Sequence, residues 1–273
     1  MGELTLELGA VLLLALGLKG LAKIRTARAA NGLAALALLL AVVGLLLQQG
    51  LTGWPWMLLG LGVGGGLGAL LAFKVAMTAM PETVALFNGC GGLSSLLVAI
   101  GAAQLPTPLN LLGQVSVLAS VLVGSITFSG SLVAMGKLQE WLGTPGWTQR
   151  PQRHAINITL AVATLVCCAL ELKGMAVALI PLTVLSLLLG IGLTLPVGGA
   201  DMPVVISLLN SYSGVAAAAA GFVVGSELLI VAGAMVGAAG LILTQVMCTA
   251  MNRSLTSVLF GGAMGAAPVG GAD

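Results

Sequence analysis

Charged residues are scarce in this sequence. They make up 7% of its 273 residues, and aromatic residues make up only 4%. A water-soluble domain usually carries about a quarter charged residues, which its hydrated surface requires. The composition therefore excludes an ordinary soluble domain. Hydrophobic residues account for 59% of the chain and the mean hydropathy is +1.14, which is typical of a protein that lies largely in lipid.

Several kinds of binding site are also missing from the sequence. The net charge is only +2, and the basic residues occur at the ends of apolar runs instead of in one patch, so nucleic acid is not an expected partner. The four cysteines lack metal-type spacing around the single histidine. The many glycines lack the strand, turn and helix context of a phosphate-binding loop. We therefore expect this chain to bind no metal and no nucleotide cofactor.

Long apolar runs predict an all-α, polytopic membrane helix bundle of about nine transmembrane helices. Two of the runs, the second and the sixth, are short for a full span. The nine runs are Leu4–Leu21, Gly32–Leu47, Trp56–Ala76, Thr83–Ala103, Leu111–Gly136, Ile156–Leu172, Met175–Leu195, Met202–Val224 and Leu228–Met251.

The distribution of positive charge predicts the orientation of these helices. With the N-terminus outside, nine of the ten lysines and arginines fall on the inner side and only Lys173 on the outer side. An odd number of spans then places the C-terminus in the cytoplasm. The sequence thus predicts a multi-pass membrane protein.

Two stretches of the chain repeat each other. Met80-Pro81 and Met202-Pro203 are each followed, seven residues after the proline, by an asparagine: Asn88 and Asn210. Each asparagine would lie roughly 10 Å along its helix, a depth that approaches the middle of a bilayer core of roughly 30 Å. A polar group at that depth indicates a site or a pathway. The repeat also predicts that helices three to five and seven to nine are two parallel units.

Small and polar residues continue from these asparagines at helical spacing. Ser207, Asn210 and Ser213 follow one stripe of helix eight, and the stripe of helix five ends at Ser131. We predict that Asn88, Asn210, Ser213, Ser207 and Ser131 line a proton pathway. In the alternative interpretation the hydroxyl groups only pack helices together and bond neighbouring backbone. The glycine series Gly60, Gly64, Gly68 and Gly233, Gly237 indicate close helix packing.

Titratable groups are missing from the middle of the predicted membrane. All eight carboxylates lie at helix ends, in loops or near the termini, and His154 lies in a basic loop. Because asparagine cannot store a proton, a proton route needs a chain of water molecules or a titratable group from another chain. Three charged residues at the cytoplasmic mouth, Glu82, Asp201 and Arg253, are candidates for gating or coupling. For the two acids, stabilisation of a helix N-terminus is the alternative role.

Three segments carry a resemblance to a known family. They are Met77–Gly89, Gly199–Gly214 and Met247–Ser254, of which the region Asp201 to Gly221 is the most specific. They resemble the membrane domain of the beta subunit of proton-translocating NAD(P) transhydrogenase. The resemblance extends from the first helix to the end and is weakest in the first two helices. One departure is that many members of the family have a histidine, regarded as the proton carrier, where this sequence has Asn88.

The resemblance implies a division of labour between domains. Soluble partner domains would bind NAD(H) and NADP(H) and exchange hydride, while proton passage through the membrane domain drives the reaction toward NADPH. Residues 1–260 would be this proton-translocating domain, and residues 261–273 the start of a linker to an NADP(H)-binding domain of the same subunit. The implied partners are an alpha subunit and its membrane helices, with the whole enzyme a homodimer. A histidine on a membrane helix of the alpha partner takes over in some members.

Two other classes of function remain open from the sequence. A stand-alone secondary transporter would also have a repeat and midplane asparagines, but it would need a substrate or ion site of its own. A structural anchor for a soluble enzyme would explain the packing glycines but not the repeated asparagine.

Overall fold

The structure, a computed structural model, describes residues 2–21, 24–48, 54–105, 109–149 and 152–260. Most of these residues are helical, and no strand occurs among them. The predicted linker, residues 261–273, lies outside the described residues. The chain divides into two compact units, Met1–Met77 and Thr78–Asp273, which are described separately.

The first unit contains α1 (Gly2–Leu21), α2 (Ile24–Gln48) and α3 (Trp54–Lys74). The helices α1 and α2 pack antiparallel through small residues, since a Cβ atom at Gly20 would lie 2.7 Å from the Cβ of Ala30. The helix α2 begins eight residues before the predicted run, because the arginines ahead of Gly32 continue the helix. In α3 the predicted packing positions Gly60, Gly64 and Gly68 have no described atom within 4 Å of a built Cβ.

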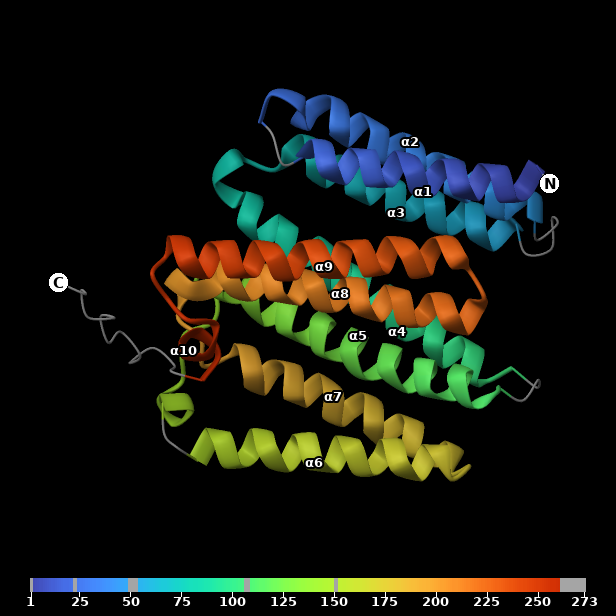
Figure 1. Ribbon diagram of the computed structural model, residues 1–273. Coiled ribbons are helices and arrows are strands. Elements are labelled where there is room, and N and C mark those ends of the chain that lie inside the picture. Colours follow the sequence, from blue (N-terminus) through green and yellow to red (C-terminus); the bar gives the residue numbers. More distant parts are fainter. Residues whose placement is uncertain (1, 22–23, 49–53, 106–108, 150–151, 261–273) are drawn as a thin grey trace. The chain divides into compact units, whose positions relative to one another are not determined.

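The described part of the second unit is a bundle of helices (Figure 1). After a 3₁₀ turn, η1 (Met77–Ala79), they follow one another with short connections. They are α4 (Met80–Ala103), α5 (Leu111–Leu138), α6 (Gln152–Leu172), α7 (Leu179–Thr194), α8 (Met202–Val224), α9 (Glu227–Ala250) and α10 (Leu255–Phe260). The helix α5 packs against α4, α7 and α8, while α9 packs on α8 and α6 on α7.

Seven helices of the described chain are long and apolar enough to cross a membrane, and two shorter apolar helices, Leu8–Leu21 and Leu179–Thr194, accompany them. This agrees with a membrane helix bundle. Besides α2, two runs differ in length from the prediction. The sixth run is a full-length helix because α6 begins at Gln152 and includes His154, which was expected in a loop. The seventh is the short one, because its first residues form the 3₁₀ turn Ala176–Ala178.

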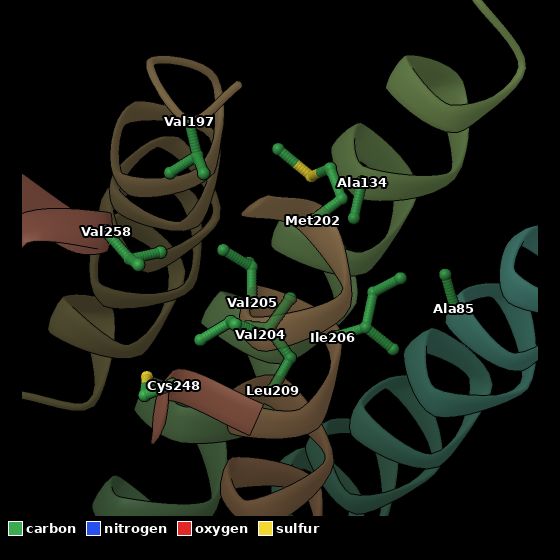
Figure 2. Packing of buried hydrophobic residues seen from close by; sticks show 10 residues of the cluster. All are labelled: Ala85, Ala134, Val197, Met202, Val204, Val205, Ile206, Leu209, Cys248 and Val258. Atoms are coloured by element: carbon green, nitrogen blue, oxygen red, sulfur yellow. The ribbon is translucent and has the colours of Figure 1, made fainter. Parts of the chain in front are cut away.

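The core of the second unit is built from two apolar clusters at opposite ends of the bundle. In one, α8 contributes Met202, Val204, Val205, Ile206 and Leu209, which pack among residues of α4, α5, α9 and α10 (Figure 2). The other cluster joins the C-terminal half of α4 to the N-terminal halves of α5 and α7, and includes Leu96, Val121 and Leu182. Between the clusters the helices meet through small and polar residues instead.

Glycines set the closest helix approaches in this middle zone. A Cβ atom at Gly92 of α4 would lie 2.8 Å from the carbonyl oxygen of Gly124 on α5. On α8, a Cβ atom at Gly214 would lie 2.7 Å from the carbonyl oxygen of Gly233 and would collide with the backbone nitrogen of Gly237 on α9. The prediction that Gly233 and Gly237 are packing positions is confirmed. Such contacts let helix backbones approach closely in lipid, where no hydrophobic force drives helices together.

Candidate proton pathway

The two Met-Pro motifs begin two neighbouring helices. Each proline lies in the first turn of its helix, Pro81 in α4 and Pro203 in α8, where its missing N–H would have had no intrahelical partner anyway. Both prolines line the same groove, and Gly91 of α4 lies against Ser213 of α8, whose Oγ would be 2.7 Å from a Cβ at Gly91. The prolines are neighbours at the start of the two helices, and Gly91 and Ser213 are neighbours further along them. The helices α4 and α8 therefore run parallel, with their motifs at the same level.

Asn88 lies on α4 between the two apolar clusters. The residue is only 7% exposed, and its Nδ2 donates to the Oγ of Ser131 on α5 at 3.1 Å. Its Oδ1 is buried without a hydrogen-bond partner among the described residues. A buried acceptor left unpaired costs about 1 to 3 kcal/mol, so this oxygen is placed to accept a hydrogen bond from a donor outside the described residues. The structure thus brings together two of the predicted pathway residues.

Asn210 occupies a groove of about 440 Å³ formed by α4, α8 and α9. The groove begins at Met80, Pro81 and Pro203 and is otherwise mainly apolar; its other lining residues are Val84, Ile206, Ser207, Asn210, Leu243 and Met247. Asn210 is half-buried. It lies one helical turn before Ser213 on α8, as Asn88 lies one turn before Gly91 on α4. The two asparagines therefore lie at one level along the parallel helices.

Ser207 lines the groove but is also tied to α9. Its Oγ donates to the carbonyl oxygen of Gly240 at 3.2 Å. The Oγ1 of Thr244 lies 3.0 Å from the Oγ of Ser207. One turn further along α8, Ser211 donates to the carbonyl oxygen of Gly237 at 2.7 Å. These bonds fasten α8 to α9. For Ser207 the structure therefore supports a packing role beside its position on the groove.

The hydroxyl stripe of α5 packs helices rather than lining the groove. The Oγ of Ser120, which is fully buried, lies 3.0 Å from the carbonyl oxygen of Ser95 on α4 and 3.1 Å from that of Ala216 on α8. Thr127 donates to the carbonyl oxygen of Val123 in its own helix. Of this stripe, Ser131 is the residue that contacts a predicted pathway residue, through Asn88.

At the end of the bundle where α8 begins, two of the three predicted coupling residues form an ion pair. The Nη2 of Arg253 lies 3.6 Å from the Oδ2 of Asp201, whose side chain is 7% exposed against 26% for Arg253. Asp201 occupies the N-cap position of α8, yet its side chain makes no capping hydrogen bond. Glu82 lies in the first turn of α4, and its Oε2 is buried without a partner among the described residues.

Lys137 is a residue whose role the sequence did not indicate. It was counted only as a positive charge at the end of a helix, but it is 7% exposed. Its Nζ donates to the carbonyl oxygen of Val197 at 2.6 Å and to the Oγ1 of Thr144 at 2.9 Å. It therefore fastens the C-terminal end of α5 to the connection between α7 and α8. A lone cation at the end of an apolar helix does not reveal from sequence whether it faces water or protein.

Among the described residues, the middle zone between the two apolar clusters contains no titratable carboxylate or imidazole. In the second unit the described carboxylates lie at helix ends or in connections; they are Glu82, Glu140, Glu171, Asp201 and Glu227. Within the described residues no three potential ligands gather into a metal site. The arrangement can orient water and donate or accept hydrogen bonds, but it cannot itself store a proton at this depth.

Comparison with known proteins decides the family. A sequence model described as NAD(P) transhydrogenase beta subunit matches residues 4–273. The chain belongs to the NAD(P) transhydrogenase beta subunit family. Two Rhodospirillum rubrum sequences called NAD(P) transhydrogenase subunit beta, one from a named strain, are each 40% identical to it over 255 residues, 90% of this chain and 55% of theirs. The chain thus spans about half the length of these transhydrogenase relatives.

Proposed function

We propose that this transhydrogenase chain is the membrane domain that couples inward proton translocation to hydride transfer from NADH to NADP⁺. Soluble partner domains, which bind NAD(H) and NADP(H), carry out the hydride transfer. The observation that carries the proposal is the buried carboxamide of Asn88, whose Oδ1 has no partner among the described residues, at the same level as Asn210 in an open groove. Membership of the family supports this role over a stand-alone transporter.

The proposed placement in the membrane uses nine spans, with α1 and α7 crossing as the two shorter helices. The N-terminus lies outside and the C-terminus in the cytoplasm of a bacterial inner membrane. In support, Lys137, Arg153 and Arg253 of the second unit gather at one end of the bundle, where they contact Val197, Thr148 and Asp201 respectively. Lys173 lies at the other end of α6. The positive-inside rule assigns the end with three cations to the cytoplasm.

The proton pathway follows the interface of α4 with α8, past Asn88, Ser131, Asn210 and Ser213. Because the described middle zone holds no carboxylate or imidazole, we place the group that accepts and releases the proton on a membrane helix of the alpha subunit. An imidazole suits this task, since its unperturbed pKa is about 6.5. The groove of about 440 Å³ at Asn210 gives such a helix a surface to pack on. A helix packed there would enclose the part of the pathway that is open at the groove.

The proposal is tested by proton flux into vesicles. Vesicles that contain this chain alone should show no proton conductance above protein-free vesicles, and vesicles with the complete set of subunits should show proton uptake linked to hydride transfer. A water-filled pathway complete within this chain would give conductance without partners, and that result would contradict the placement of the proton carrier on the alpha subunit. Loss of NADPH formation in the complete enzyme, with all subunits assembled, would contradict the function itself.

A further inference from the structure

A second groove lies away from the proposed proton pathway, between α6 and α7. It has a volume of about 510 Å³ and is bounded at one end by Pro196 and by Leu259 of α10. Its lining residues are Arg153, His154, Asn157, Ile158, Ala161, Leu189, Leu193, Pro196 and Leu259. The contacts that carry the proposed proton pathway involve α4, α5, α8 and α9, so this groove needs a separate explanation.

The lining of this groove is divided into a cationic end and an apolar body. Arg153 and His154 lie in the first turn of α6. Ile158, Ala161, Leu189 and Leu193 form the walls further along the two helices. At 1.5 Å per residue, Ala161 lies roughly 12 Å along α6 from Arg153. Acidic residues are missing from the lining, and the sequence contains none from Trp141 to Leu170.

Arg153 is held in a fixed position at this end. It is 7% exposed, its Nη1 donates to the carbonyl oxygen of Thr148 at 3.1 Å, and its Nε donates to the Nε2 of His154 at 3.2 Å. The guanidinium and the imidazole are thus held together in the first turn of α6.

We propose that this groove binds one phospholipid with an anionic headgroup. The phosphate lies against Arg153 and His154, and one acyl chain lies between α6 and α7 along Ile158, Ala161, Leu189 and Leu193. Two features of the groove support a lipid over a free anion: the apolar body is long enough for part of an acyl chain, and basic pockets between membrane helices near the cytoplasmic surface suit anionic headgroups. The inference depends on the membrane placement of α6 and α7, and it does not depend on the proton pathway.

The test uses the complete enzyme in detergent, with bound lipid counted by native mass spectrometry during titration with phosphatidylglycerol or phosphatidylcholine. We expect one phosphatidylglycerol per chain to be retained in preference to phosphatidylcholine. Arg153→Gln should weaken its retention roughly fivefold, the effect expected of one basic residue near a membrane surface, whereas Arg153→Lys should retain most of it. Ala161→Trp, which fills the apolar body without changing charge, should abolish retention.

Matched controls separate lipid binding from damage to the fold. Lys173→Gln removes a cation at the other end of α6, and Ala169→Trp adds an indole at an exposed position outside the groove; both should bind phosphatidylglycerol as the wild type does. Unchanged retention in both Arg153→Gln and Ala161→Trp would overturn the proposal, as would equal retention of the two lipids. Displacement of the lipid by millimolar inorganic phosphate would identify a free-anion site and also overturn it. The thermal midpoint of each lipid-free variant reports whether it is folded.

Discussion

The ion pair between Asp201 and Arg253 gives the sharpest prediction about coupling. Its charged atoms lie 3.6 Å apart and the side chain of Asp201 is 7% exposed. At that distance two unit charges attract by about 4 to 5 kcal/mol at an effective dielectric constant of about 20. Arg253→Gln leaves a buried carboxylate without this partner, which typically costs about 3 to 5 kcal/mol. Asp201→Asn leaves a half-buried guanidinium that water still reaches, so its cost should be smaller.

A double-mutant cycle measures whether the pair acts as a unit. Because Asp201→Asn combined with Arg253→Gln removes both charges, we expect the double variant to be more stable than Arg253→Gln alone, with a coupling of about 1 to 3 kcal/mol. Thermal inactivation midpoints of the complete enzyme report stability, and NADPH formation with and without an imposed proton gradient reports coupling. Both single variants should retain hydride transfer but lose its response to the gradient.

Two results would refute this reasoning. If the three variants are additive within about 0.5 kcal/mol, the pair contributes no interaction energy. If Asp201→Asn lowers stability and the response to the gradient is unchanged, the acid acts only on the helix end, which is the alternative role considered for it. Lys173→Gln, a change of an exposed cation at the opposite end of α6, is the control for a change of net charge alone.

Three further predictions follow from the packing of the pathway. Asn210→Leu should block proton-linked hydride transfer without unfolding the protein, and wild-type pumping by this variant would remove Asn210 from the pathway. The control is Asn157→Leu, which removes a carboxamide that donates to the carbonyl oxygen of Gly192 on α7. This control should lower stability and leave proton transfer intact. Gly214→Ala should destabilise the enzyme by about 1 to 3 kcal/mol, because its Cβ meets α9 backbone, while Gly101→Ala, with open space around it, should not. Lys137→Met should cost about 1 to 3 kcal/mol by leaving the carbonyl oxygen of Val197 unpaired, as thermal midpoints would show, and an unchanged midpoint would contradict the contact.

The sequence was sufficient to predict the helices of the described chain. Apolar runs predicted every long helix because helices that must satisfy their backbone in lipid leave an uninterrupted apolar stretch. Errors occurred where polar residues continue a helix, as at the start of α2 and α6, or where a 3₁₀ turn shortens one, as before α7. The pairing of Asn88 with Ser131 could not be predicted, since periodicity gives the face of each helix but not the helix that it meets.

The same limit explains why hydroxyl groups on similar stripes have different partners. Ser207 and Ser120 lie on regular stripes of α8 and α5, yet one is bonded to α9 and the other is shared between α4 and α8. In each case the partner is a backbone carbonyl oxygen, and in α9 it belongs to Gly240, where the absence of a side chain admits the close approach. Sequence spacing identifies the donor. Only the packing of three helices identifies the acceptor.

These contacts also indicate how a signal at the mouth can reach the asparagines. The ion pair ties the start of α8 to the residues that follow α9, and the glycine contacts together with the bonds of Ser207 and Ser211 tie the same two helices along their middle. The helices α8 and α9 therefore resist sliding against each other, and we expect them to move as one body. Against α4, by contrast, α8 is held near the pathway by the Gly91 and Ser213 contact beside an open groove. A soluble domain that alters the Asp201 pair in one of its states would then shift α8 and α9 against α4, and this displacement would change the distance between Asn88 and Asn210, the two asparagines of the proposed proton pathway.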